Sequence, residues 1–229
     1  MDIRTLPDSE REIYNKIKAQ YKVHFDRLKV GGETIRLLKV ADLEEFLDGK
    51  DPFADVSEFP FWIKLWESAI VLAYVMHSLP GAEGRTVLEL GAGLGAPGIA
   101  AAAAGFDVTI TDYEDIIMDF QRVSVAASGL ENVKLRHLDW LDPPDMEPFD
   151  FLIGAEILFR EEFFEPLLSV FRKYLKPDGK IFLAHEATRK SLPLFLERAA
   201  SEFRIGINKQ EMKKDGVEKT IIINQLSWK

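Results

Sequence analysis

A glycine-rich turn is the part of the sequence whose residues could most directly do chemistry. The apolar run Val87–Leu90 precedes glycines at positions 91, 93 and 95, and an alanine-rich stretch from Ile99 to Ala104 follows. Glycines allow positive φ angles and a close approach of the backbone to a ligand, and a helix that begins behind the turn presents free N–H groups. This strand, turn and helix therefore predict a nucleotide-binding site.

Two nucleotide cofactors fit such a turn. The pattern Gly91-x-Gly93-x-x-Ala96 satisfies a loose dinucleotide motif, and Asp112 follows about 20 residues later, where a ribose-binding acid belongs. Other features favour S-adenosylmethionine over NAD. Glu89 lies inside the strand, where a dinucleotide fold usually has an apolar residue, and more than eighty residues precede a unit with which NAD domains tend to open. We therefore expect S-adenosylmethionine, with NAD as the rival.

Composition narrows the classes of function. The chain has 229 residues, 47% of them hydrophobic, which is enough for one sizeable core. The absence of cysteine excludes disulfides, thiolate metal sites and a cysteine nucleophile, and no metal is expected. The N-terminus lacks a signal-peptide pattern and no apolar run reaches about 18 residues, so we expect no membrane partner and a cytoplasmic location. A net charge of −9 argues against a nucleic-acid partner, although acidity also serves solubility.

Hydrophobic periodicity indicates the elements that lie before the turn. Apolar residues at helical spacing predict a surface helix over residues 8–20, with a capping acid at its start. Two strand-like runs around Gly31-Gly32 predict a hairpin, which would cover a sheet edge or shape a substrate entrance. A loop is expected over 48–55, followed by a buried helix over 60–74.

From residue 86 onward, predicted strands and helices alternate. Strands are expected at 86–90, 107–111, 132–137, 149–154 and 179–184, and helices at 96–104, 114–128, 161–175 and 190–202. Such alternation predicts a parallel sheet with right-handed crossovers. Two further strands, 203–210 and 220–226, flank the turn signal Lys213–Gly216, so one strand must run antiparallel. The expected fold is a doubly wound, mostly parallel seven-stranded α/β sheet that ends in an antiparallel hairpin.

The ordered set of motifs resembles the seven-β-strand (class I) S-adenosylmethionine-dependent methyltransferases, and within them the protein-lysine methyltransferases and their bacterial relatives. The resemblance implies a methyltransferase domain over 60–229, preceded by a helix-and-hairpin extension over 1–59. The motifs that carry it are Leu65–Ala73, Leu88–Gly93, Thr111–Tyr113, Leu138–Trp140, Gly154–Phe159 and Leu175–Gly179.

The resemblance also implies a cofactor site. Trp66 would line the pocket, Asp112 would bind the ribose hydroxyls and Trp140 would flank the adenine. A carboxylate at the end of a parallel strand is well placed to accept ribose hydroxyls, and an indole offers a flat surface to a purine. Gly91 and Gly93 would pass close to the methionine moiety, with Ala155 beside the cofactor. The remaining cofactor-site residues expected from these motifs are Glu89, Ala92, Gly95, Tyr113 and Asp139.

The segment expected to border the methyl acceptor departs from the family pattern. Family members usually carry Asp or Glu, two spacers and Tyr after the fourth strand, whereas this chain has Glu156-Ile157-Leu158-Phe159. We expect Glu156 to dock and orient the amine of a lysine side chain or of a small molecule, with water accepting the proton. Phe159 can form an apolar wall but has no hydroxyl to donate or accept a hydrogen bond.

Three further side chains lie near predicted strand ends. His137 and His185 lie where a general base could sit, but a lone histidine at a strand end is more often a bystander, and Glu186 is positioned to help bind a basic acceptor.

Other functions are compatible with the same cofactor-binding residues. A small-molecule N- or O-methyltransferase would differ at the acceptor surface alone, and a non-catalytic cofactor-binding module is favoured by the missing hydroxyl at Phe159. The residues leave the oligomeric state open.

Overall fold

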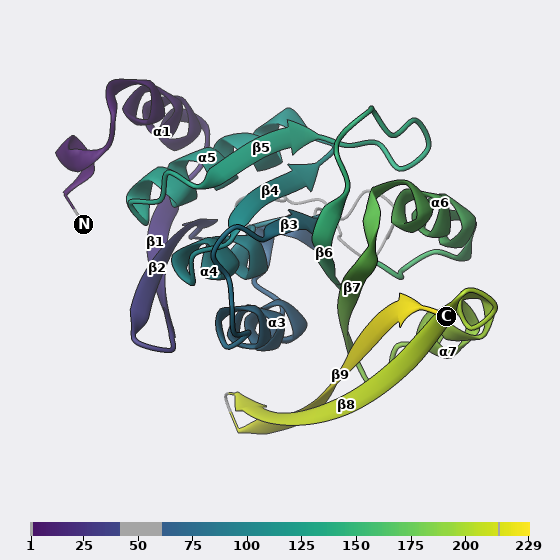
Figure 1. Cartoon of the computed structure of the whole chain (residues 1–229). Coiled ribbons are helices and arrows are strands. Elements are labelled where there is room, and N and C mark those ends of the chain that lie inside the picture. Colours follow the sequence, from purple (N-terminus) through teal and green to yellow (C-terminus); the bar gives the residue numbers. More distant parts are fainter. Residues whose placement is uncertain (1, 42–60, 215) are drawn as a thin grey trace.

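A seven-stranded sheet organises the chain (Figure 1). The structure, a computed structural model, describes residues 2–41, 61–214 and 216–229. The strand order is β5-β4-β3-β6-β7-β9-β8, and β9 runs antiparallel to both of its neighbours while the other pairs are parallel. This confirms the expected fold class. The strands are β3 (Thr86–Glu89), β4 (Asp107–Asp112), β5 (Val133–His137), β6 (Phe149–Ala155), β7 (Leu175–Glu186), β8 (Phe203–Lys214) and β9 (Val217–Trp228).

Helices cover both faces of the sheet because successive side chains of a buried strand point to opposite sides. On β7, Leu183 belongs to the core under α6 and α7, whereas Ala184 belongs to the core that includes residues of α3 and α4. The helices are α3 (Glu67–His77), α4 (Ala96–Ala103), α5 (Asp115–Ala127), α6 (Phe164–Tyr174) and α7 (Ser191–Ala199), and a short 3₁₀ turn, η3 (Glu161–Phe163), precedes α6.

The strand order reverses between β3 and β6. From β3 the chain builds outward to β4 and β5 on one side, and then returns to β6 and β7 on the other. In open α/β sheets, ligands bind at such a switch point, beyond the carboxyl ends of the strands. The loops that follow β3, β4 and β6 are therefore the ones that can form a site.

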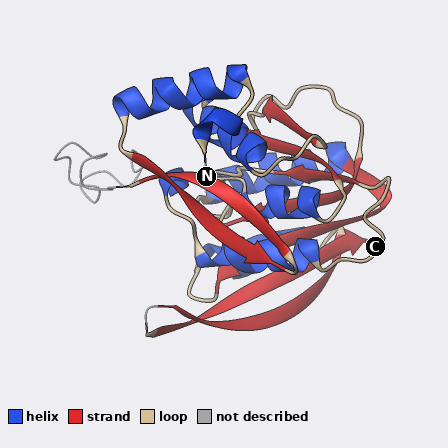
Figure 2. Ribbon diagram, turned by 90° about the vertical axis from the view of Figure 1, so that its left-hand side faces the viewer, coloured by secondary structure: helices blue, strands red, loops and turns tan. Residues whose placement is uncertain are grey.

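The N-terminal part forms a separate layer outside the sheet. It comprises η1 (Ile3–Thr5), α1 (Asp8–Gln20) and the hairpin of β1 (Val23–Val30) and β2 (Glu33–Val40). Figure 2 shows the hairpin in front of the helices. The backbone N–H of Leu38 donates to Ser124 Oγ of α5 at 2.9 Å, so the hairpin covers a helix and not the edge of the large sheet. The expected acidic cap of α1 was wrong, since Pro7 is the N-cap and Asp8 lies in the first turn.

The expected helix over 60–74 is shorter than predicted. Residues Phe61–Ile63 form a 3₁₀ turn, η2, and α3 begins at Glu67. Trp66 is the extended N-cap residue of α3, and its indole N–H donates to the Phe61 carbonyl at 2.9 Å. Trp62 packs edge-on against Phe120 of α5, with ring centroids 5.0 Å apart. These tertiary contacts of aromatic side chains replace the regular helix that hydrophobicity alone predicts. The loop expected over 48–55 lies outside the described residues.

Candidate functional site

The loop between β3 and α4 has the left-handed backbone that its glycines permit. Gly91, Gly93 and Gly95 have φ angles of 54°, 53° and 72°. A Cβ atom on Gly91 would lie 3.1 Å from Cζ2 of Trp140, and a Cβ on Gly93 would lie 3.4 Å from Cα of Trp62. The loop is thus closely flanked by two tryptophans, and its backbone lies at the switch point of the sheet.

Asp112 is the carboxylate that ends β4 beside this loop. Its side chain accepts the backbone N–H of Gly93 at 2.8 Å and that of Tyr113 at 2.9 Å. The residue is 6% exposed, and burial raises the pKa of its carboxyl to about 6, although both N–H donors favour the ionised form. A carboxylate has about four acceptor positions, so Asp112 retains capacity for hydroxyl donors.

Glu89 lies on the inner side of the same loop. It ends β3, is 1% exposed, and accepts the backbone N–H of Gly98 in α4 at 2.9 Å. Burial raises the pKa of this carboxyl to about 8. Its geometry therefore favours a role in holding the loop against α4 over the direct cofactor contact expected from the sequence.

Two loop-supporting side chains were missed in the sequence. Gln121 of α5 is fully buried, and its amide donates to the Gly93 carbonyl at 2.8 Å. Trp62 also lies against Gly93, with its Cα 3.4 Å from where a Cβ on that glycine would be. The signal for Gln121 was present, because it is a polar residue on the apolar face of a predicted amphipathic helix. Trp62 had no distinguishing signal within an aromatic run.

The other residues expected to bind the cofactor lie around this loop and differ in how buried they are. Trp140 is half-buried and meets Phe163 edge-on, with ring centroids 5.7 Å apart. Ala155 ends β6, the strand next to β3. Tyr113 is 69% exposed and Asp139 is exposed, which places both at the rim. Trp66 lies at the start of α3, with the Lys64 ammonium 4.4 Å from its ring centroid.

Glu156 follows β6 and, among the described residues, is the one non-glycine position with a positive φ, 56°. Its side chain is 11% exposed and accepts the backbone N–H of Glu186 at 2.7 Å. The Arg189 guanidinium binds the other carboxylate oxygen, with Nε 3.1 Å away and Nη2 closer. The expected free carboxylate is therefore an ion pair, and Arg189 is a site residue that the sequence analysis missed.

The candidate bases are not free groups in the crevice. His185 is fully buried, its Nε2 accepts the backbone N–H of Leu158 at 3.3 Å, and burial lowers its pKa to about 3. His137 contacts Asp115 at 2.7 Å. Glu186 lies 3.4 Å from the ammonium of Lys219, which also contacts Glu67 at 3.3 Å. Of the two interpretations left open for His185, the buried position fits the bystander and not the base, because its strand position faces the core under α6 and α7.

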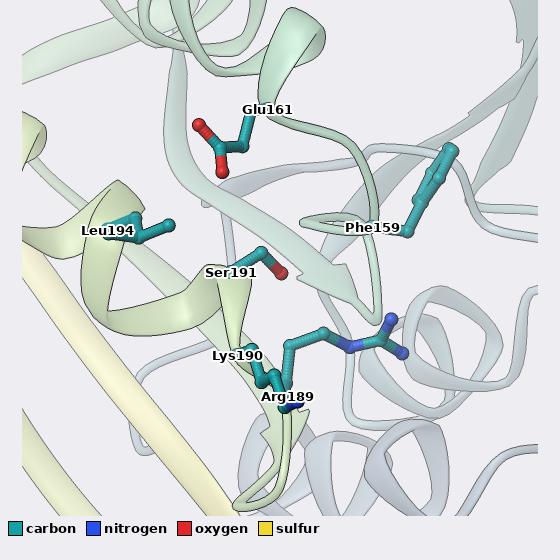
Figure 3. A pocket seen from close by; sticks show the side chains of 6 residues that line it. All are labelled: Phe159, Glu161, Arg189, Lys190, Ser191 and Leu194. Atoms are coloured by element: carbon teal, nitrogen blue, oxygen red, sulfur yellow. The ribbon is translucent and has the colours of Figure 1, made fainter.

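A pocket of about 320 Å³ opens between the segment after β6 and the start of α7, and its lining includes Arg189, the ion-pair partner of Glu156 (Figure 3). Arg189 reaches from this pocket to Glu156, and the Ser191 hydroxyl donates to the Leu158 carbonyl, which links the two segments. Phe159, which lines the pocket, is 46% exposed. The full lining is Phe159, Glu161, Arg189, Lys190, Ser191 and Leu194.

The described part of the chain contains neither a candidate membrane span nor a candidate metal site. None of its helices is both long and apolar enough to span a bilayer. Within the same residues, no three His, Asp or Glu side chains are grouped as they would be around a metal ion.

Known proteins resemble the region that contains these loops. A family model described as lysine methyltransferase matches residues 60–202. The protein N-lysine methyltransferase METTL21A of Xenopus tropicalis is 34% identical over 147 residues, which cover 62% of this chain and 68% of that protein. The histidine protein methyltransferase 1 homolog of Dictyostelium discoideum is 31% identical over 150 residues, covering 62% of this chain and 48% of that protein.

Solved structures resemble the fold. The ribosomal protein L11 methylase of Lactobacillus delbrueckii subsp. bulgaricus superposes with a TM-score of 0.58 at 22% identity, covering 72% of this chain and 81% of that one. At this identity the likeness speaks for the fold alone.

Proposed function

Since the chain belongs to the lysine methyltransferase family, we propose that it transfers the methyl group of S-adenosylmethionine to a lysine side chain of a protein substrate. The observation that carries the proposal is the family match itself. It spans residues 60–202, and so includes the glycine loop, Asp112 and the segment from Glu156 to Arg189. The match to METTL21A, which is named as a protein N-lysine methyltransferase, supports the same acceptor.

The loop geometry fits the cofactor. Gly91 and Gly93 have no side chain, so their backbone is accessible at the C-terminal ends of the parallel strands. At the same place, Asp112 can still accept hydrogen bonds and Trp140 provides an aromatic surface. We assign the ribose hydroxyls to Asp112 and the adenine to Trp140, with Ala155 beside them. Ala92 and Gly95 belong to the loop, Tyr113, Asp139 and Trp66 to the rim, and Glu89 and Gln121 support the loop from behind.

When bound, S-adenosylmethionine would supply a methyl group on a sulfonium sulfur, and the bond from that methyl to sulfur breaks to leave a neutral thioether, which is a good leaving group. The chain's own residues then have to align the acceptor and favour its neutral form. A lysine amine has a reference pKa of about 10.4, so its deprotonation at neutral pH costs roughly 4–5 kcal/mol. Glu156 alone would stabilise the ammonium and oppose that step. The Arg189 guanidinium on the same carboxylate offsets this effect, because a neighbouring cation disfavours the ammonium.

Glu156 and Phe159 therefore have complementary proposed roles. The Glu156 carboxylate keeps capacity to accept one N–H of the amine while Arg189 balances its charge, and water takes the proton. Phe159 contributes an apolar wall that excludes water from the approaching methylene chain.

Histidine is the second candidate acceptor. The similarity to a histidine protein methyltransferase homolog favours it, and an imidazole with a reference pKa of about 6.5 needs little deprotonation at neutral pH. Hydrolysis of labelled protein followed by amino-acid analysis separates methyl-lysine from methyl-histidine.

The test uses S-adenosylmethionine labelled in its methyl group together with a lysate of the source cells. Protein and small-molecule fractions are separated and counted, with the Asp112→Asn variant as the control for cofactor-dependent transfer. We expect label on a protein band with the wild-type enzyme and at least about tenfold less with the variant. Label confined to small molecules would overturn the protein acceptor.

A further inference from the structure

The pocket beside Glu156 has an uneven charge balance. Among its lining residues, Arg189 is paired with Glu156. The one acidic lining residue, Glu161, lies 3.5 Å from the guanidinium of Arg198. In each of these two ion pairs, the positive charge of the arginine is balanced by the negative charge of the glutamate.

Lys190 is the remaining charge of the lining. It is exposed, and within the described part of the chain it has no carboxylate within ion-pair distance. The pocket therefore presents one uncompensated positive charge, in a protein whose net charge is −9. Because the negative net charge of the protein repels anions, any preference of the pocket for an anion must come from the Lys190 charge.

The pocket walls suit a side chain that has an aliphatic stem. Phe159 and Leu194 are 46% and 44% exposed, unusually open for large apolar residues. Figure 3 shows their side chains projecting from the segments on either side of the pocket. The bond from Ser191 to the Leu158 carbonyl joins those two segments, so the walls are held together before any ligand arrives.

We propose that this pocket recognises an acidic side chain, Asp or Glu, that lies close in sequence to the methylated residue of the substrate protein, with Lys190 as the specificity-determining residue. The inference rests on the proposed function, because it takes Glu156 as the acceptor site. Lys190 directly follows Arg189, whose guanidinium contacts Glu156, so a substrate segment with its target amine at Glu156 has its neighbouring residues at the pocket.

The experiment measures peptide binding and so does not depend on turnover. Fluorescein-labelled peptides with a central lysine carry Asp, Asn or Lys at the flanking positions, and a parallel set has alanine in place of the central lysine. Fluorescence anisotropy is recorded with the 229-residue protein in the presence of S-adenosylhomocysteine. We expect the Asp peptide to bind at least about fivefold more tightly than the Asn peptide, in both sets, with a preference that weakens as salt is added.

Two charge reversals locate the preference. Lys190→Glu is expected to abolish the preference for Asp over Asn. Lys180→Glu, in the middle of β7 and outside the pocket lining, is the matched control: Lys180 is also exposed, and the reversal changes the net charge equally. Circular dichroism of both variants checks that the fold is intact.

Equal binding of the Asp and Asn peptides to the wild-type protein would overturn the pocket assignment, as would an equal loss in both variants, which would indicate a general charge effect. The alanine-centred peptides separate the two claims. If their Asp preference persists while the labelled-lysate assay shows no lysine methylation, the proposed function fails and the pocket stands.

Discussion

Two buried carboxylates lie beside the glycine loop and contact different parts of it and of the helix that follows. Asp112 contacts the loop through Gly93, whereas Glu89 contacts the helix behind it through Gly98. Each is bound by backbone N–H donors, yet burial dominates and raises both pKa values. Ionisation of either carboxyl therefore costs stability, and the two groups titrate in different pH ranges: Asp112 near pH 6 and Glu89 near pH 8.

Cofactor binding is expected to depend on the titration of Asp112. Its carboxyl has a pKa of about 6, and the ionised form is the stronger acceptor for ribose hydroxyls. Below pH 6 the Asp112 carboxylate becomes protonated and accepts hydroxyl hydrogen bonds less well. The affinity for S-adenosylhomocysteine should therefore fall as pH falls, by up to about tenfold per pH unit. Calorimetric titration between pH 5 and pH 8 measures this. Asp112→Asn should bind at least about tenfold more weakly at pH 8 and lose the pH dependence, whereas a flat profile for the wild type would contradict the assignment.

Protein stability is expected to depend on Glu89 with a definite sign. In the unfolded chain this carboxyl ionises near pH 4.5, but in the fold it ionises near pH 8, so the folded state binds more protons between these values. Stability should therefore decrease as pH rises from about 4.5 to 8. Glu89→Gln keeps an acceptor for the Gly98 N–H and removes the ionisation.

Urea unfolding at pH 5 and at pH 8 tests this. From pH 5 to pH 8, the free energy of unfolding of the variant should rise by roughly 4 kcal/mol relative to that of the wild type. Parallel changes in the two proteins would show that Glu89 is not the buried titrating group.

At the scale of elements, the N-terminal hairpin is attached to the body by its turn as well as by its strands. Gly31 has a φ of 59°, and a Cβ atom there would overlap the His77 ring at the end of α3. The Tyr74 hydroxyl donates to the Lys29 carbonyl at 2.6 Å. The turn is thus a docking point on α3 as well as a chain reversal.

The hairpin turn offers a matched pair of substitutions. Gly31→Ala is expected to destabilise the protein by about 1–3 kcal/mol, because it adds left-handed strain and a clash with His77. Gly32→Ala should be nearly neutral, since a Cβ atom there has no neighbour within 4 Å among the described residues. Thermal unfolding of the two variants makes the comparison, and similar losses in both would argue against the contact with His77.

The elements of the sheet could be predicted because each has a local signal. Alternating apolar runs and turn residues located β3 to β9 in order, and Lys213–Gly216 marked the final reversal. The segment before α3 could not be predicted, because its shape depends on Trp62 packing against Phe120 of a distant helix.

Within the site, the pattern of glycines and Asp112 was visible in the sequence, but the state of Glu156 was not. Arg189 lies 33 residues away from it, and an ion pair between loops of different strands leaves no local periodicity. For a related reason the sequence left open whether His185 is a base or a bystander. Which face of β7 it occupies depends on how α6 and α7 cover the sheet.

At the scale of the whole molecule, the N-terminal extension shares a core with the sheet domain. Tyr14, Ile17 and Leu38 belong to one buried cluster with Phe120 and Val123 of α5. We propose residues 1–59 as an extension and 60–229 as the methyltransferase domain, with the extension as a structural layer over α5. The boundary itself lies outside the described residues.

Removal of residues 1–59 tests this dependence. Phe120 and Val123 are fully buried in the complete chain, and the truncation would expose them as an apolar face on α5. We expect the 60–229 protein to aggregate, or to unfold at a temperature at least about 5 °C lower than the complete chain. A soluble truncated protein with unchanged thermal stability would show that the domain needs no extension.

The identity of the methylated residue decides whether the protein is a lysine methyltransferase. The enzyme is incubated with S-adenosylmethionine that carries a deuterated methyl group and with a lysate of the source cells, and tandem mass spectrometry locates the heavy methyl groups. We expect heavy methyl on lysine side chains of protein, with transfer strongly reduced for Asp112→Asn. Heavy methyl found on histidine, on arginine or on small molecules, with lysine unlabelled, would contradict it.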